Sequence, residues 1–171
     1  MTTSAVGLAP PPGNPPYVAA KAGVAALTIV CAIELAELGV RVNAIAPVAR
    51  SRISQVVAPD HMKPVDHGFD RMAPENVAAL VVYLASSLCH FTGRIFGIVG
   101  NDLTIFDGWT ASLHIENNEQ RWTQEALQRV LTDVAPQQRG MAQALKGITE
   151  HITPPDTVLE TLAAVARGRA E

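Results

Sequence analysis

The amino-acid sequence predicts an α/β fold in which helices and strands alternate along the chain and the helices cover a largely parallel sheet. Two helix–strand pairs predict this architecture. An alanine-rich helix over residues 17–38 precedes a strand over residues 40–47, and a helix over residues 74–87 precedes a strand over residues 93–100. The first strand is continuously hydrophobic, which is typical of interior parallel strands rather than strands with one face in water.

The first helix has clear start and stop signals. Pro15 and Pro16 end a proline-rich loop over residues 9–16, and proline is tolerated in a first helical turn, where amide groups lack helical partners. Gly39 follows the last apolar residue and favours termination. Apolar side chains lie on several sides of this helix, so we expect it to be buried or to pack in a subunit interface.

Residues 48–73, between the first strand and the second helix, have a different character. Residues 50–57 can form a short helix, but the rest contains two prolines, a glycine and scattered charges, which predict a loop. Irregular segments of this length often serve function, and we expect a flap here. Pro74 then opens the second helix, with Glu75 in its first turn.

The composition becomes more polar after about residue 115. Two amphipathic segments there, residues 122–134 and 156–170, predict helices. We therefore expect a main domain over residues 1–115 and a helical C-terminal extension over residues 116–171.

The overall composition excludes several classes of binding partner and cellular location. The net charge is −3 and both signs are mixed along 171 residues, so no basic block indicates nucleic acid or an acidic membrane surface. No run of about 18 apolar residues predicts a membrane-spanning helix, and the N-terminal residues lack the features of a secretory signal. Cys31 and Cys89 lie outside CxxC pairs, which is typical of reduced cysteines in a cytoplasmic protein without a zinc site.

One pair of residues at the start of the first helix suggests chemistry. Tyr17 and Lys21 are four positions apart, so both side chains can lie on one helix face. An ammonium group close to a phenol stabilises the phenolate, and such a tyrosine can serve as a general acid or base nearer neutral pH. Ser4 precedes Tyr17 by thirteen positions, and its hydroxyl could bind a substrate carbonyl. The Tyr-x-x-x-Lys spacing alone is also common as a plain helix-face pair.

The order of these segments resembles the short-chain dehydrogenase/reductase family. The motifs that match are Ser4, Tyr17-x-x-x-Lys21, the stretch Asn43–Pro47, and the late helix and strand, over roughly residues 1–108. Further similarity, running to about residue 150, is to the (3R)-hydroxyacyl-CoA dehydrogenase domains of peroxisomal multifunctional enzymes and their bacterial relatives. The resemblance implies the C-terminal half of a Rossmann-like, doubly wound parallel sheet.

The same resemblance implies catalytic roles for three residues. Tyr17 would exchange a proton with the substrate oxygen, Lys21 would lower the pKa of that phenol and hold the nicotinamide ribose, and Ser4 would orient the substrate oxygen. The implied reaction is hydride transfer between C3 of an acyl thioester, or another small hydroxy or keto compound, and NAD or NADP. The implied assembly is a homo-oligomer in which the long helix pairs with its symmetry mate.

The resemblance also implies a cofactor-binding turn after the first strand. Pro47, Val48 and Ala49 match the turn whose backbone meets the nicotinamide carboxamide, and Ser51 matches a hydroxyl near the cofactor. Many family members have glycine where this chain has Val48. Residues 50–72 match the flap over the substrate.

One part of the family pattern is missing from the sequence. No G-x-x-x-G-x-G motif, which binds the cofactor pyrophosphate, occurs in the 171 residues, and the family's catalytic asparagine has no counterpart. We therefore expect a fragment that lacks hydride-transfer activity unless an N-terminal half completes it. The alternative is a non-catalytic or degenerate relative that associates with a partner through its hydrophobic helices.

Two further groups of residues have simpler interpretations. His61 and His67 flank Asp66 in the flap, and solvated loop residues are favoured over a metal site, for which no second-shell pattern exists. Trp109 and Trp122 could line an acyl-chain path, but packing of the extension is favoured.

Overall fold

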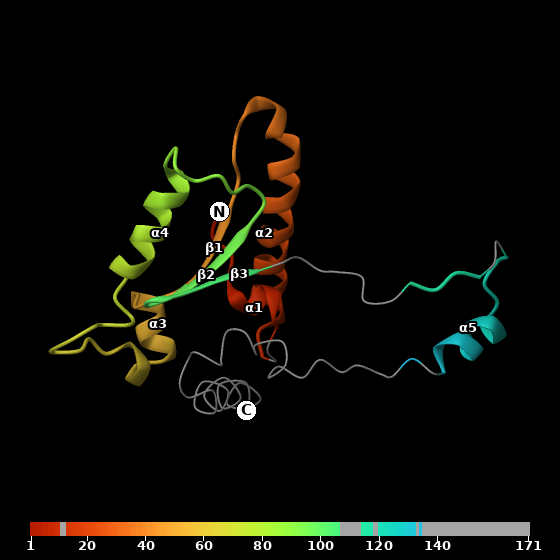
Figure 1. Ribbon diagram of the computed structural model, residues 1–171. Coiled ribbons are helices and arrows are strands. Elements are labelled where there is room, and N and C mark those ends of the chain that lie inside the picture. The colour runs from red at the N-terminus through yellow and green to blue at the C-terminus, as the bar shows by residue number, and fades with distance from the viewer. Residues whose placement is uncertain (11–12, 107–113, 118–119, 133, 135–171) are drawn as a thin grey trace.

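A computed structural model of the chain describes residues 1–10, 13–106, 114–117, 120–132 and 134 (Figure 1). The described part is an α/β structure with a three-stranded sheet. Its helices are α1 (Ala5–Leu8), α2 (Pro15–Glu34), α3 (Arg52–Val57), α4 (Glu75–Ala85) and α5 (Gln124–Leu131), and its 3-10 turns are η1 (Ala36–Leu38) and η2 (Asp60–Met62). The strands are β1 (Ala44–Val48), β2 (Ile95–Val99) and β3 (Asp102–Phe106).

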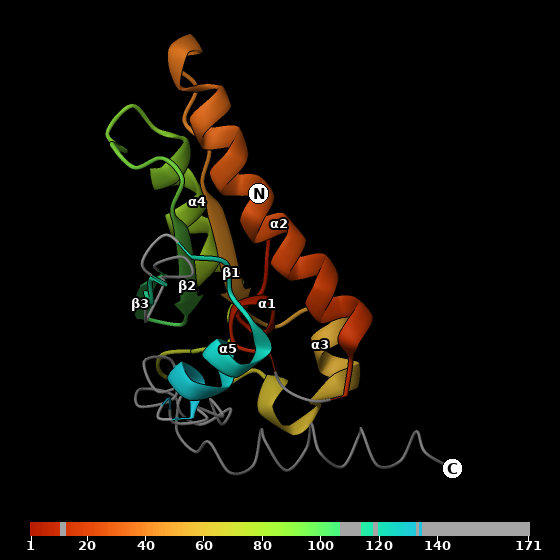
Figure 2. The same ribbon diagram turned by 90° about the vertical axis from the view of Figure 1, so that its right-hand side faces the viewer.

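The sheet lies between α2 and α4, as Figures 1 and 2 show. On one face Ala25 of α2 packs with Ala44, Ala46 and Ile95. On the other face Leu80 of α4 packs with Phe96 and Ile98, and Phe91 contacts the Phe96 ring edge-on at 5.4 Å between centroids. Successive strand residues point to opposite faces, which explains why both strands are apolar throughout. The layered architecture predicted from the sequence is confirmed.

The sheet is mixed rather than wholly parallel. β1 pairs in parallel with β2, with Ala44 opposite Ile95, whereas β2 pairs antiparallel with β3, with Val99 opposite Asp102. We did not predict β3 from the sequence. A two-residue Gly100–Asn101 turn produces it, and Gly100 adopts the left-handed conformation (φ 59°) that such tight hairpins require.

The first residues of the chain extend the sheet beyond β1. Thr2 forms a parallel bridge with Ile45, the Thr3 amide donates to the Ile45 carbonyl at 2.8 Å, and the Ile45 amide donates to the Met1 carbonyl at 2.9 Å. Residues 1–3 therefore take the place of a strand end beside β1. Ser4 is the next residue and leads into α1.

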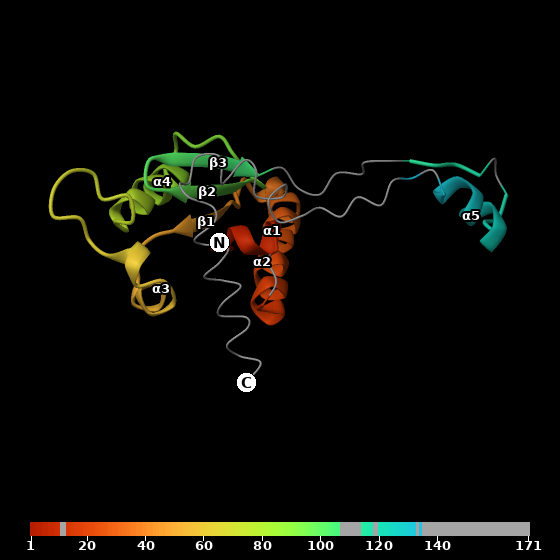
Figure 3. The ribbon, with the colours of Figure 1, turned by 90° about the horizontal axis from the view of Figure 1, so that it is seen from below.

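Two helices were predicted in the C-terminal part of the chain. α5 falls inside the first amphipathic segment, and it lies apart from the sheet in Figures 1 and 3. The second amphipathic segment and Trp109 lie outside the described residues, and Trp122 is 39% exposed. The boundary between the two predicted domains stays a prediction.

α2 is apolar and long enough, by length and composition alone, to cross a membrane. The expectation from uninterrupted apolar runs did not include it, because Lys21 interrupts the run. In the structure Ala25, Thr28 and Ala32 of this helix are buried. Packing against the sheet and α1 therefore accounts for only part of its apolar character. Apolar side chains of α2 that stay exposed include Leu27, Val30 and Ile33.

Candidate active site

The tyrosine and lysine of the opening helix lie on one face of α2, as their spacing predicts. Asn14 caps this helix, with its side-chain oxygen accepting a hydrogen bond from the Tyr17 amide at 3.4 Å. This places Tyr17 in the first turn, with its side chain partly in solvent. The Lys21 ammonium lies 5.7 Å from the centre of the Tyr17 ring, within the range of a cation–π contact.

Residues 2, 3 and 7 contact Lys21 from the strand end and helix that precede α2. The Lys21 ammonium donates to the Thr2 carbonyl at 3.1 Å, and the Thr3 hydroxyl donates to the Lys21 carbonyl at 2.5 Å. Gly7 of α1 lies against the backbone of Lys21 and Ala22, where a Cβ atom would stand only 2.7 Å from backbone atoms of both. The end of the first strand segment is thereby joined to α2.

Ser4 lies between these contacts, at the start of α1. Its backbone is extended, its carbonyl accepts from the Gly7 amide at 3.0 Å, and its hydroxyl does not cap the helix. α1 lies beside the N-terminal half of α2 in Figures 1 and 2. Ser4 is therefore carried on the same strand end that binds Lys21.

The turn predicted to meet the cofactor follows β1 at the same edge of the sheet. Pro47 and Val48 end the strand, and Ala49 leads into α3. Parallel strands expose their carboxyl ends at one edge, which is where ligands bind in open α/β sheets. The strand end before Ser4 and the end of β1 are neighbours, so the fold brings the two predicted groups of site residues to one edge.

Ser51 caps α3 through a reciprocal pair of hydrogen bonds with Ser54. The Ser54 amide donates to the Ser51 hydroxyl at 3.1 Å, and the Ser51 amide donates to the Ser54 hydroxyl at 2.7 Å. The Ser54 hydroxyl also donates to the Ala49 carbonyl at 3.0 Å. Ser51 thus has a structural role as a cap, and Ser54 fixes the carbonyl of the predicted cofactor turn.

An open groove of about 600 Å³ runs along this turn. Its walls are mostly apolar and come from the turn and from one side of α4. The residues that line it are Pro47, Ala49, Arg50, Ser51, Pro74, Val77, Ala78, Val81 and Val82. Pro47, Ala49 and Ser51 of the predicted cofactor turn therefore share one concave surface, whereas Ser4, Tyr17 and Lys21 do not line it.

The two ends of the flap are bound to each other, and its second end is also bound to β3. Arg50 forms an ion pair with Asp70, and its amide donates to the Met72 carbonyl at 2.7 Å. The hydrogen bond from Arg50, helped by the Met72 amide, holds the pKa of the Asp70 carboxyl below its usual range, against an opposing effect of burial. Arg71 forms an ion pair with Asp102 of β3.

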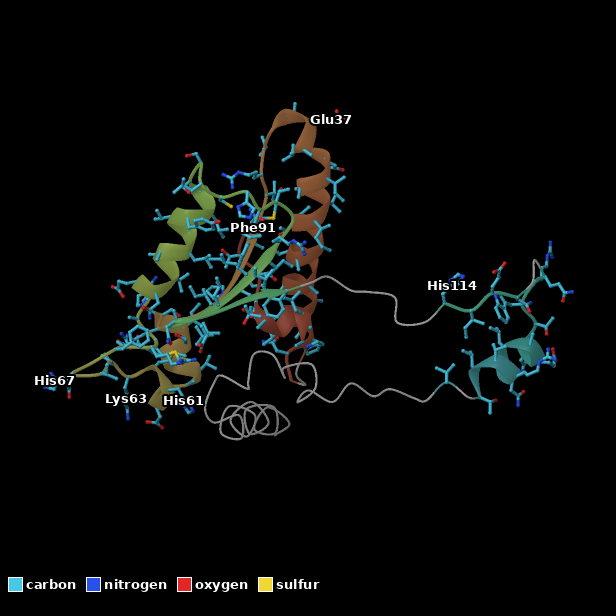
Figure 4. All side chains as sticks on the ribbon, viewed as in Figure 1. Glu37, His61, Lys63, His67, Phe91 and His114 are labelled. Atoms are coloured by element: carbon cyan, nitrogen blue, oxygen red, sulfur yellow. The ribbon has the colours of Figure 1, made fainter. Side chains whose placement is uncertain are left out.

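The outer part of the flap is exposed. His61, Lys63 and His67 lie at the outer edge of the molecule in Figure 4, away from the sheet. Lys63 pairs with Asp60 at 2.7 Å, a contact in full solvent that lowers the pKa of Asp60 and raises that of Lys63. The flap is thus a loop fixed at its two ends.

Sequence reasoning missed four residues of this region. Thr3, Gly7 and Ser54 contact predicted site residues, and Asp70 pairs with Arg50 at the base of the flap. None of the four belongs to a spacing motif that we used. A glycine three positions after Ser4, in a segment too short for a free helix, is the one signal that could have been noticed. The catalytic and cofactor roles of the predicted site residues themselves stay predictions.

Comparison with known proteins gives the family. A family profile described as enoyl-(acyl carrier protein) reductase matches residues 1–98, more than half of the chain. The hydroxyacyl-CoA dehydrogenase ChsB1 of Mycobacterium tuberculosis is 38% identical over 109 residues, which are 61% of this chain and 33% of that protein. The peroxisomal multifunctional enzyme type 2 of Mus musculus is 33% identical over 116 residues, 68% of this chain and 14% of that protein. The chain thus spans a third or less of the length of these relatives.

Solved structures agree with this result. A short-chain dehydrogenase from Mycobacterium avium superposes with a TM-score of 0.62 at 39% identity, covering 77% of this chain and 40% of that one. The full-length peroxisomal multifunctional enzyme type 2 of Drosophila melanogaster gives a TM-score of 0.58 at 23% identity, covering 95% of this chain and 28% of that one, and so supports the Rossmann-like fold alone. Family profile, relatives and fold agree, and the chain belongs to the short-chain dehydrogenase/reductase family of oxidoreductases.

Proposed function

We propose that this chain carries the acid/base half of an NAD(P)-dependent oxidoreductase that interconverts 3-hydroxyacyl and 3-oxoacyl thioesters. The observation that carries the proposal is the placement of Lys21 beside Tyr17, with its ammonium hydrogen-bonded at the strand end that leads to Ser4. The thioester class is supported by the names of the M. tuberculosis and mouse relatives. Free Cys31 and Cys89 are consistent with a reducing, cytoplasmic setting.

Each of the three residues has a distinct task in the proposed reaction. During oxidation the Tyr17 phenolate oxygen accepts the proton of the 3-hydroxyl group, and during reduction the Tyr17 hydroxyl returns it to the substrate oxygen. The Ser4 hydroxyl donates to the same substrate oxygen and fixes its position. An ammonium has three donors, so Lys21 can keep its bond to the Thr2 carbonyl and still reach a ribose hydroxyl of the cofactor.

The residues present fit the nicotinamide end of a dinucleotide. The groove beside Pro47, Ala49 and Ser51 has apolar walls and exposes the backbone of a turn, which suits a flat carboxamide-bearing ring. When bound, NAD(P) accepts or supplies the hydride at C3 of the substrate. The pyrophosphate-binding glycine motif is not among the 171 residues, so we propose that an N-terminal half, in the same or another chain, completes the cofactor site.

The proposed assembly is homo-oligomeric through α2. Leu27, Val30 and Ile33 of this helix are exposed, and apolar patches of this kind mark interaction surfaces. The same observation favours the second candidate, a non-catalytic relative that only associates with a partner through these helices.

The test compares this chain with a fusion that restores the missing half. The N-terminal residues of the M. tuberculosis relative that precede the matched region are joined ahead of Met1, and NADH binding is followed by fluorescence. We expect saturable binding and reduction of a 3-oxoacyl-CoA by the fusion only, with Tyr17→Phe abolishing turnover but not binding.

Other results would change the proposal. Saturable NADH binding by the 171-residue chain would contradict the requirement for an N-terminal half. A fusion that binds NADH but leaves 3-oxoacyl and other keto substrates unreduced would support the non-catalytic candidate.

A further inference from the structure

Lys21 is contacted at three points by residues that belong to none of the sequence motifs. Its ammonium donates to the Thr2 carbonyl at 3.1 Å, and its own carbonyl accepts from the Thr3 hydroxyl at 2.5 Å. Thr3 is only 2% exposed, so its hydroxyl has little access to water as an alternative partner. The side chain of Lys21 is thus bound to Thr2 and its backbone to Thr3, the next residue of the neighbouring strand.

The third contact is a close approach of two helices at Gly7. A Cβ atom at this position would lie 2.7 Å from the Ala22 nitrogen and the Lys21 carbonyl carbon, and 2.9 Å from the Lys21 Cβ. Backbone atoms in a helix cannot move aside as a flexible side chain can, so a side chain here would push α2 away from α1. A Cβ atom at Gly23, on α2 itself, would have no atom within 4 Å, so the close approach is specific to Gly7.

We infer that Thr3 and Gly7 are positioning residues that set where Lys21 stands relative to Ser4. This inference rests on the proposed function, since it concerns the lysine of the proposed acid/base couple. Both residues touch Lys21 rather than substrate or cofactor. They act by tying the helix that carries Lys21 to the strand end that carries Ser4.

A second buried threonine on α2 provides a matched control. Thr28 is fully buried, and its hydroxyl donates to the Val24 carbonyl at 2.8 Å and lies 3.4 Å from the Met1 sulfur. Thr3→Val and Thr28→Val each remove one buried hydroxyl at nearly constant shape. Only Thr3→Val removes a bond to Lys21, and Thr3→Ser should restore that bond.

The measurement is the rate at which an amine-directed acylating reagent labels Lys21, relative to Lys63, read by peptide mass spectrometry on the folded chain. Lys63 is the internal reference because its side chain is well exposed in the flap. We expect Thr3→Val to raise the Lys21/Lys63 labelling ratio about threefold or more, as befits the loss of one hydrogen bond. Gly7→Ala should raise it as well, whereas Thr3→Ser, Thr28→Val and Gly23→Ala should keep the wild-type ratio.

The inference is overturned if Thr3→Val leaves the ratio unchanged, or if Thr28→Val raises it equally. Should Gly7→Ala fail to fold, the threonine variants decide the question alone. The labelling ratio requires neither cofactor nor turnover, so an inactive fusion protein would count against the proposed function and not against this inference. In an active fusion, Thr3→Val should lower kcat more than it raises KM, and Thr3→Ser should recover kcat.

Discussion

The ammonium of Lys21 lies 5.7 Å from the centre of the Tyr17 ring while it donates to the Thr2 carbonyl. Among the described residues the Lys21 ammonium binds the Thr2 carbonyl and not the Tyr17 oxygen. This arrangement leaves the Tyr17 hydroxyl available to a substrate. The bond to Thr2 also links this pair of residues to the first strand segment.

Tyr17→Phe should reduce hydride transfer in the fusion protein by about 10²–10⁴-fold, the usual contribution of a general acid or base. NADH affinity should change little, since only one hydroxyl is lost. The assay is NADH absorbance with a 3-oxoacyl-CoA. Tyr83→Phe is the matched control, because Tyr83 is the other tyrosine of the chain and lies on α4. Equal activities of the two variants would exclude Tyr17 as the acid/base.

Phe96→Ala should lower the free energy of unfolding by about 3–5 kcal/mol, the range for removing a large buried aromatic side chain. Phe96 is 2% exposed and packs between Leu80, Ile98 and the edge of Phe91. Urea denaturation followed by circular dichroism provides the measurement. Phe69→Ala, at a 59% exposed position in the flap, should change the stability by less than about 0.5 kcal/mol. Similar losses for both variants would contradict the assigned core.

The described helices other than α1, and the two parallel strands, could be predicted because composition and periodicity are local properties. The boundaries of β1 show the limit of such reasoning. The predicted strand began at Val40, whereas β1 begins at Ala44, since residues 40–43 do not pair along β2. β3 was missed although its five residues alternate regularly in burial, because its pairing with β2 depends on a two-residue turn at Gly100.

The candidate site likewise contains residues that the sequence predicts and residues that only the folded structure reveals. Tyr17 and Lys21 are found by spacing, since i and i+4 residues always share a helix face. Thr3, Gly7 and Asp70 act through contacts between segments that lie 14 to 20 residues apart. No periodic pattern encodes such contacts, so they become visible only once the chain is folded.

Ile33→Asp should shift the chain towards a monomer if α2 forms the proposed subunit contact. Ile33 is 71% exposed on this helix, and a buried carboxylate without a partner opposes association strongly. Light scattering coupled to size-exclusion chromatography measures the mass directly. Ile53→Asp is the matched control, because Ile53 is 79% exposed but lies on α3. A mass that both variants leave unchanged would count against α2 as the interface.

Asp70→Asn should destabilise the protein at pH 7 and have little effect well below pH 4. Its pKa is held low in the folded state, chiefly by the hydrogen bond from Arg50, whereas the unfolded chain titrates near the ordinary value of about 3.9. The carboxylate therefore stabilises the fold above that unfolded value, and the stabilisation is lost as the pH falls through the lower folded pKa.

The midpoints of urea unfolding of the wild-type protein and of Asp70→Asn, measured at pH 7 and at about pH 2.5, test this pH dependence. Asp60→Asn is the matched control, since Asp60 pairs with Lys63 in full solvent, where an ion pair contributes little. The Asp70 variant should have the lower midpoint of the two at pH 7, and the difference from wild type should vanish in acid. A difference that persisted in acid would show that the amide disturbs packing at the flap base and that the Arg50 ion pair is not the source of the stability.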